Sequence, residues 1–209
     1  MRIGIDAMGS DQAPVAEVKG ALEAQSLLSD GDKIVLVGVE SAIRQHLEGV
    51  SGWEDKIEIH HTDQYIRMDD KPVESLRTKP NSSLALMTRL HAEGKVDACI
   101  SAGNTGAFVA ASMMGLRRLP GVQRPGIAII APTFHGPVVL CDVGANVNCR
   151  AQHLHQYGVM ASIYSRAICK IESPRVALMS VGEEAAKGND LVKKTRELLE
   201  AEPSVNFVG

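Results

Sequence analysis

The feature that most constrains the fold is a short apolar run that leads through a glycine turn into a helical pattern. Ala98-Cys99-Ile100 is typical of a buried parallel strand, and residues 108–118 have helical spacing. The turn between them is Ser101-Ala102-Gly103-Asn104-Thr105-Gly106-Ala107. Such a connection points the free N–H groups of a helix N-terminus at one spot, where the helix dipole favours an anion. Two interpretations follow: a cradle for phosphate or an oxyanion, and a tight connection capped by Asn104.

Four residues of this turn are candidates for ligand contact. Gly103 and Gly106 would let the backbone approach a ligand closely, and Asn104 and Thr105 would add side-chain hydrogen bonds. The turn is not a Walker loop, because the spacing differs and no lysine follows.

Strand and helix patterns alternate along the whole chain. Strands are predicted near residues 2–6, 33–38, 56–60, 98–100, 175–181 and 205–209, with helices near 14–29, 41–47, 84–91, 108–118, 151–171 and 190–200. Two further strands, 127–132 and 137–142, are joined by a short turn, which predicts a β-hairpin. Residues 62–82 are polar and irregular, as in an active-site loop or a surface excursion. The alternation predicts an α/β fold with a mostly parallel sheet.

Polar residues follow several of these strands at their carboxyl ends, which is where ligands bind in such sheets. They are Asp6, the Gly103-Asn104-Thr105 turn, Asp142, Asn146 and Glu183. Lys187 lies between a predicted strand and helix, at the expected crevice. A lysine there would bind phosphate or polarise a carbonyl, and the alternative is a solvated loop residue.

Composition excludes several classes of protein. Aromatic residues make up 3% of the 209 residues, which argues against the stacking platforms of single-stranded nucleic-acid binding. The four cysteines show no metal-like spacing, and Cys149 is a buried thiol or, less readily, a nucleophile without an evident histidine base. No apolar stretch approaches the roughly 18 residues of a membrane span. With the strand pattern that begins at Arg2, these features predict a cytoplasmic protein without a signal peptide.

Charge is distributed unevenly along the chain. Residues 1–97 carry 11 basic and 17 acidic side chains, whereas residues 98–171 carry six basic side chains and one acidic one, Asp142. The middle third would therefore attract an anionic substrate, an acidic protein or an anionic membrane face, unless its arginines merely coat solvated helices.

Five motifs, taken in order, resemble the bacterial phosphate acyltransferases, which are acyl-ACP:phosphate transacylases. They are Ile5-Asp6-Ala7-Met8-Gly9-Ser10-Asp11-Gln12-Ala13-Pro14, Arg77-x-Lys79 followed by Ser82-Ser83, Ser101–Ala107, Asp142-Val143-Gly144-Ala145-Asn146-Val147-x-Cys149, and Gly182-Glu183-Glu184-x-x-Lys187-Gly188-Asn189. The resemblance implies a three-layer α/β/α sandwich with a mostly parallel, Rossmann-like sheet, related to the phosphotransacetylase and isopropylmalate dehydrogenase folds. The family continues beyond Gly209, so we expect one domain over residues 1–209 that is short at its C-terminus.

The resemblance also implies an activity and partners. The family moves a fatty acyl group from acyl carrier protein to inorganic phosphate, and the acyl phosphate serves phospholipid synthesis. The resemblance implies a cytoplasmic homodimer that touches the inner membrane face. We expect neither a cofactor nor a metal.

Roles for individual residues follow as hypotheses. Asn104, Lys187 and Asp6 are the catalytic candidates. Asn104 and Thr105 would hold phosphate or the oxyanion, and Lys187 would neutralise developing charge. A set of four polar residues would order the strand-end loops and include a candidate proton acceptor: Asp6, Asp11, Asp142 and Asn146. Arg77 and Lys79 would contact phosphate or the carrier's phosphopantetheine. The substrate-binding candidates are Gly103, Thr105, Gly106, Arg77, Lys79, Ser82, Asp142, Asn146, Glu183 and Asn189. Two alternatives remain, a phosphate acetyltransferase that uses coenzyme A thioesters and an inactive module that binds anions or membranes.

Overall fold

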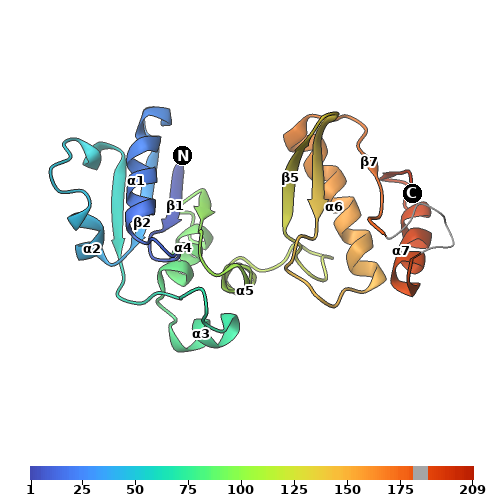
Figure 1. Cartoon of the computed structure of the whole chain (residues 1–209), viewed down its shortest axis with the longest axis horizontal. Coiled ribbons are helices and arrows are strands. Elements are labelled where there is room, and N and C mark those ends of the chain that lie inside the picture. The colour runs from blue at the N-terminus through green and yellow to red at the C-terminus, as the bar shows by residue number, and fades with distance from the viewer. Residues whose placement is uncertain (181–187) are drawn as a thin grey trace. The chain divides into compact units, whose positions relative to one another are not determined.

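The computed structural model describes residues 1–180 and 188–209 and divides the chain into two compact units, Met1–Arg117 and Arg118–Gly209 (Figure 1). The first unit contains a parallel sheet between helices, and the second contains a hairpin, two helices and a pair of short strands. The single domain over residues 1–209 stays a prediction.

The sheet of the first unit has four parallel strands in the order β3-β2-β1-β4. Its strands are β1 (Arg2–Asp6), β2 (Lys33–Gly38), β3 (Ile57–His61) and β4 (Ala98–Ile100). β1 lies between two partners, so that Gly4 is opposite Val35 on one side and Cys99 on the other. The predicted mostly parallel sheet is confirmed. β4 differs from the expected buried strand, because it forms an edge of this sheet and Ile100 is 53% exposed.

The helices of this unit agree with the predicted ones except in one segment. They are α1 (Val15–Ala24) followed by the 3₁₀ turn η1 (Gln25–Leu27), α2 (Glu40–Gln45), the turn η2 (Trp53–Asp55), α3 (Pro72–Thr78), α4 (Ser83–Ala92) and α5 (Thr105–Gly115). α3 corrects the irregular loop expected at residues 62–82. It begins with Pro72 at its first position, and its Leu76 is buried in a cluster with Leu84 and Ala111. Packing against α4 and α5 therefore stabilises a helix too short to persist alone.

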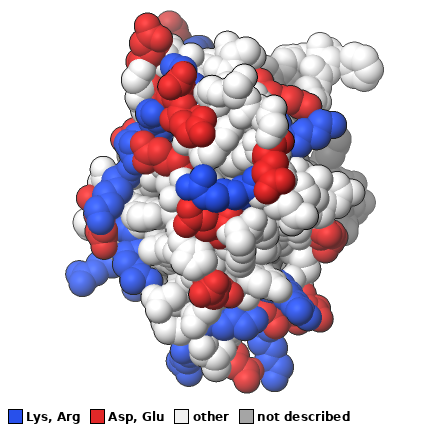
Figure 2. Space-filling model, turned by 90° about the vertical axis from the view of Figure 1, so that its left-hand side faces the viewer, with Lys and Arg blue, Asp and Glu red and all other residues white. Residues whose placement is uncertain are grey.

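Acidic and basic side chains are interspersed on the face that is seen from the α2 side (Figure 2). The ion pairs of this unit include Arg2 with Glu58 at 2.6 Å and Arg44 with Glu40 at 2.7 Å. The acidic excess of residues 1–97 consequently does not gather into one patch on this face.

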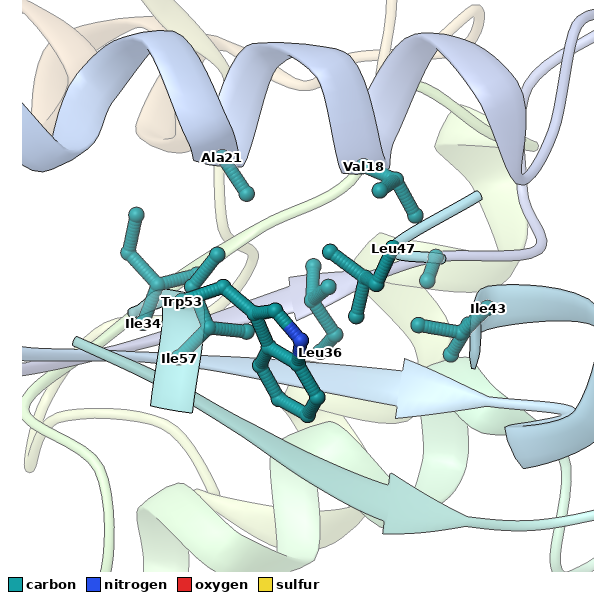
Figure 3. Close-up of a cluster of buried hydrophobic side chains, with 9 residues drawn as sticks. Val18, Ala21, Ile34, Leu36, Ile43, Leu47, Trp53 and Ile57 are labelled. Carbon is teal, nitrogen blue, oxygen red and sulfur yellow. The ribbon is translucent and has the colours of Figure 1, made fainter. Parts of the chain in front are cut away.

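Alternating side chains of β2 create two cores, one on each side of the sheet. Ile34 and Leu36 face a cluster formed with α1, α2 and Trp53 (Figure 3). Val35 and Val37 face the opposite way and pack with Met87 of α4. Period-two alternation thus places helices over both faces of this sheet, which agrees with the three-layer α/β/α arrangement that the resemblance implies.

The second unit is organised around its long helix α6. The elements are the antiparallel strands β5 (Ala128–Thr133) and β6 (Gly136–Cys141), α6 (Ala151–Cys169), the parallel strands β7 (Arg175–Val176) and β8 (Asn206–Phe207), and α7 (Asp190–Glu200). The predicted hairpin is confirmed, whereas β7 is shorter than expected. A Cβ atom on Gly158 of α6 would lie 3.0 Å from Leu199 Cδ2, so this glycine permits the close packing of α6 on α7.

Candidate functional site

A pocket of about 430 Å³ lies in the first unit, between two loops that follow strands at their carboxyl ends. One loop follows β1 and contributes residues 8–11 and Ala13, and the other follows β3 and contributes Tyr65 and residues 67–69. Its size and its place at strand ends are typical of a ligand site in an open α/β sheet. Several predicted site residues of this unit contact these two loops, among them Asp6, Asn104 and Lys79.

Asp6 lies beneath the first loop, at the end of β1, and is 1% exposed. Its carboxylate accepts hydrogen bonds from the hydroxyls of Ser83 at 2.6 Å and Ser101 at 2.8 Å, and from the Met8 N–H at 3.2 Å. Burial raises the pKa of Asp6 above its ordinary value, and the two hydroxyls oppose that shift. The carboxylate thereby connects β1, the start of α4 and the end of β4.

Gly9 and Gly103 bring the first loop against the turn before α5. A Cβ atom on Gly103 would lie 2.9 Å from Gly9 Cα, and one on Gly9 would lie 2.5 Å from Asp6 Oδ2. Because both partners are backbone or a buried carboxylate, neither position has room for a side chain. Gly103 therefore allows the turn before α5 and the loop after β1 to pack backbone against backbone.

Asn104 caps α5 and holds the second loop. Its Oδ1 accepts from the Ala107 N–H at 3.0 Å. Its Nδ2 lies 3.3, 3.1 and 2.9 Å from the carbonyl oxygens of Arg67, Met68 and Asp70. The side chain is 8% exposed, and its polar atoms have protein partners.

The second loop has another anchor at Lys79. Its ammonium pairs with Asp70 Oδ2 at 2.6 Å, and the same oxygen accepts from the Arg67 N–H at 3.0 Å. The Lys79 ammonium is the main reason that the pKa of Asp70 is lowered. In the pocket wall, hydrogen bonding to Tyr65 raises the pKa of Arg67.

The other predicted residues of this unit either cap or pack helices or are exposed. Ser82 is fully buried and caps α4, because its Oγ accepts from the Ala85 N–H. A Cβ atom on Gly106 would meet Pro72 at 2.8 Å, so this glycine packs α5 on α3. Thr105 and Arg77 are exposed.

Asp142 and Asn146 lie in the second unit and contact each other. The Asp142 carboxylate accepts from the N–H groups of Ile127 at 2.7 Å and Asn146 at 2.8 Å. The Asn146 amide donates to the carbonyl of Pro125 at 2.8 Å. These bonds hold the loop after β6 against the segment before β5, and the predicted part of both residues in substrate binding stays a prediction.

The last predicted residues follow β7. Asn189 caps α7, with its Oδ1 accepting from the Val192 N–H at 3.0 Å. Glu183 and Lys187 lie outside the described residues, so their predicted roles stay predictions.

Partial burial makes three of the thiols poor nucleophiles. It raises the pKa of Cys99 and of Cys141 to about 11. It also raises the pKa of Cys149, whose Sγ lies 3.8 Å from the Asn146 carbonyl oxygen. Cys149 is partly exposed and not fully buried as expected, and its raised pKa favours an inert thiol over a nucleophile.

Sequence reasoning did not select Tyr65, Arg67, Met68 and Asp69 as site residues. They belong to the polar stretch 62–82, for which the sequence leaves open an active-site loop or a surface excursion and singles out no lining residue. Their place beside β1 depends on contacts with Asn104, more than 30 residues away in the sequence. Among the residues that the structure describes, no group of three or more His, Cys, Asp and Glu side chains is placed to hold a metal ion.

A family model described as "Fatty acid synthesis protein" matches residues 1–209. The chain belongs to this family. Its relatives include proteins named phosphate acyltransferase from Bacillus subtilis strain 168, at 43% identity, and Oceanobacillus iheyensis, at 46% identity. Both alignments cover the whole chain but 62% and 61% of those relatives' own lengths. The expected resemblance is confirmed, as is the expectation that the relatives are longer.

The structure is similar to that of the EutD phosphotransacetylase from Staphylococcus aureus. The TM-score is 0.67 at 19% sequence identity, over 100% of this chain and 68% of the other. This likeness confirms the expected relation to the phosphotransacetylase fold. Within the described ranges, every helix is too short or too polar to cross a lipid bilayer.

Proposed function

We propose that this protein reversibly transfers a fatty acyl group from acyl carrier protein to inorganic phosphate. The acyl phosphate would then supply phospholipid synthesis through phosphatidic acid. The observation that carries this proposal is the alignment of the whole chain with proteins named phosphate acyltransferase, at 40–46% identity.

The chemistry suits a site without an activated side-chain nucleophile. A phosphate oxygen attacks the thioester carbonyl carbon, the C–O bond forms, the C–S bond breaks, and the leaving sulfur takes a proton. Phosphate is thus the nucleophile, and the protein needs only to hold it near the thioester and to stabilise the oxyanion. The raised pKa values of Cys99 and Cys141, which are partly buried, support a mechanism without a cysteine nucleophile.

The pocket between the two loops is the proposed location of one substrate in this unit. Asp11 and Asp69 outnumber Arg67 among its charged lining residues, so it suits the acyl donor better than a phosphate dianion. The exposed start of α5, with Thr105, is the proposed anion contact. Lys187 remains the proposed group that neutralises developing charge, and Arg77 remains a proposed contact of phosphate or of the carrier's phosphopantetheine.

Partners and location are proposed on charge and on the resemblance. Residues 98–171 carry an excess of five positive charges, which would attract an acidic carrier protein. We also propose a cytoplasmic homodimer with peripheral contact to the inner membrane face, and activity without nucleic acid, metal or cofactor.

The second candidate is a phosphate acetyltransferase acting on a coenzyme A thioester, which the fold likeness to EutD favours. The third is a module that binds anions or membranes without turnover. The three differ in the donor that they accept.

One assay separates them. The assay supplies palmitoyl-ACP and inorganic phosphate and uses hydroxylamine to trap any acyl phosphate that forms. It compares two proteins, residues 1–209 alone and the same sequence extended to the full length of the relatives. Turnover with palmitoyl-ACP supports the proposal. Turnover with acetyl-CoA alone would favour the acetyltransferase, and binding of ACP or anionic vesicles without turnover at either length would favour the module.

A further inference from the structure

The side-chain amide of Asn104 faces three carbonyl oxygens of one short loop. Its Nδ2 lies within 3.3 Å of the Arg67, Met68 and Asp70 oxygens, while its Oδ1 faces the Ala107 N–H. The opposite orientation of the amide would set Oδ1 against three acceptors and Nδ2 against a donor. The hydrogen-bond network therefore fixes which atom points toward the loop.

The atoms held in this way form a wall of the pocket. Arg67 and Met68 line it directly, and Asp70 follows the lining residue Asp69. The loop is closed on itself, because the Asp70 N–H donates to the Arg67 carbonyl oxygen at 3.2 Å and the Arg67 N–H donates to the Asp70 carboxylate. Each of these bonds contributes little net stability, because water competes for the same groups, so without an outside anchor the loop would open and expose the Arg67 and Asp70 amides to water.

Lys79 supplies a second anchor from the other side. Its Nζ lies 2.6 Å from Asp70 Oδ2, and both side chains are about one-third exposed or less. An amide at the start of α5 and an ammonium after α3 therefore hold the same four residues. The wall is connected to two helices that already pack on each other through Gly106 and Pro72.

We propose that Asn104 is a positioning residue, which holds residues 67–70 as the wall of the acyl-donor pocket and does not contact the reacting atoms. This inference rests on the proposed function, since it assigns the pocket to the acyl donor. It replaces our hypothesis that the Asn104 side chain holds phosphate. The reason is that both donors and the acceptor of this side chain already have protein partners, and the side chain is buried.

Asn104→Asp is the decisive variant, because it separates the cap from the anchor. One carboxylate oxygen can still accept from the Ala107 N–H, so the cap of α5 is kept. The other oxygen can no longer donate, and it repels the three carbonyl oxygens. We expect hydrogen exchange of the Arg67 and Asp70 amides to accelerate by about tenfold or more, with the first turn of α5 unchanged.

The kinetic expectation is specific to one substrate. In the transfer assay with the full-length protein, N104D should raise KM for palmitoyl-ACP at least about fivefold. KM for phosphate should change less than twofold. A rise in KM for phosphate alone, with loop exchange unchanged, would overturn the proposal in favour of direct phosphate contact. Unchanged exchange together with unchanged KM for palmitoyl-ACP would also overturn it.

Two further variants keep the test decisive. Lys79→Met removes the second anchor and should accelerate the same amides, even if N104D folds poorly. Asn206→Asp makes the same charge change at an exposed residue of β8 and should leave loop exchange unchanged. If the unsubstituted protein forms no acyl phosphate, the proposed function fails, while the exchange comparison still decides whether Asn104 holds the loop.

Discussion

Substituting alanine for Gly103 should destabilise the first unit through a single steric contact. The added Cβ atom would lie 2.9 Å from Gly9 Cα, 3.0 Å from Gly9 O and 3.2 Å from Gly9 C. All three atoms are backbone, so no side-chain rotation can relieve the contact. Gly9 in turn cannot retreat freely, because it lies against the buried carboxylate of Asp6.

The expected cost follows from comparison with other overpacked sites. Forcing a methyl group into a filled position costs about 1–3 kcal/mol in the free energy of unfolding. Gly20→Ala is the matched control, because Gly20 lies within α1 and its Cβ atom would have no neighbour within 4 Å. Alanine in a helix interior is about 0.5–1 kcal/mol better than glycine, so G20A should stabilise.

Urea unfolding followed by tryptophan fluorescence tests this pair. The chain has one tryptophan, and Trp53 is buried in the core of the first unit, so its emission reports on that unit. We expect the midpoint of G103A to fall by about 1 M urea or more, and that of G20A to stay or rise. A G103A midpoint equal to that of the unsubstituted chain would refute the close approach of the two loops.

Three other predictions address single groups. Burial raises the pKa of Asp6 in the folded protein, so the contribution of Asp6 to the free energy of unfolding is fully present below about pH 4 and is lost as the pH rises. In urea titrations, the stability of the unsubstituted chain relative to D6N should therefore fall between about pH 4 and 7. A difference that stays constant with pH would contradict this. With pKa values of about 11, Cys99 and Cys141 should react with iodoacetamide at pH 8 roughly a hundredfold more slowly than free cysteine, as peptide mass spectrometry can measure. Asp142→Ala removes the acceptor of three backbone N–H groups and should lower the free energy of unfolding by about 2–3 kcal/mol. Unfolding followed by circular dichroism measures this change, and an unchanged free energy would show that the loop does not depend on Asp142.

The sequence predicts those elements whose own residues determine them. β2 is recognisable because a run of four apolar residues is buried on both faces, and α6 because its pattern persists over 19 residues. The hairpin follows from two apolar runs around a short turn. By contrast, α3 has seven residues and depends on Leu76 packing against α4 and α5, which no local pattern reveals.

The candidate site is predictable in its position more than in its chemistry. The ends of β1 and β4 lie side by side in the parallel sheet, which places Asp6 and the turn with Asn104 at the same edge, as their positions after strands predict. Local sequence gives no sign that the Asn104 amide is satisfied by residues 34–37 positions away. A polar side chain beside a turn has the same appearance in sequence whether its partner is a ligand or another loop.

The strand order has a consequence for the time course of folding. β1 lies between β2 and β4, and Ile3 pairs with Ala98. During synthesis, β1, β2 and β3 can assemble early, but one edge of β1 stays open until residues 98–100 have been made. Contacts so distant in sequence are slow to form, and an unpaired edge invites association with other chains. The Asp6 carboxylate accepts from the Ser101 hydroxyl only when that edge closes, so this hydrogen bond forms after β4 has joined the sheet.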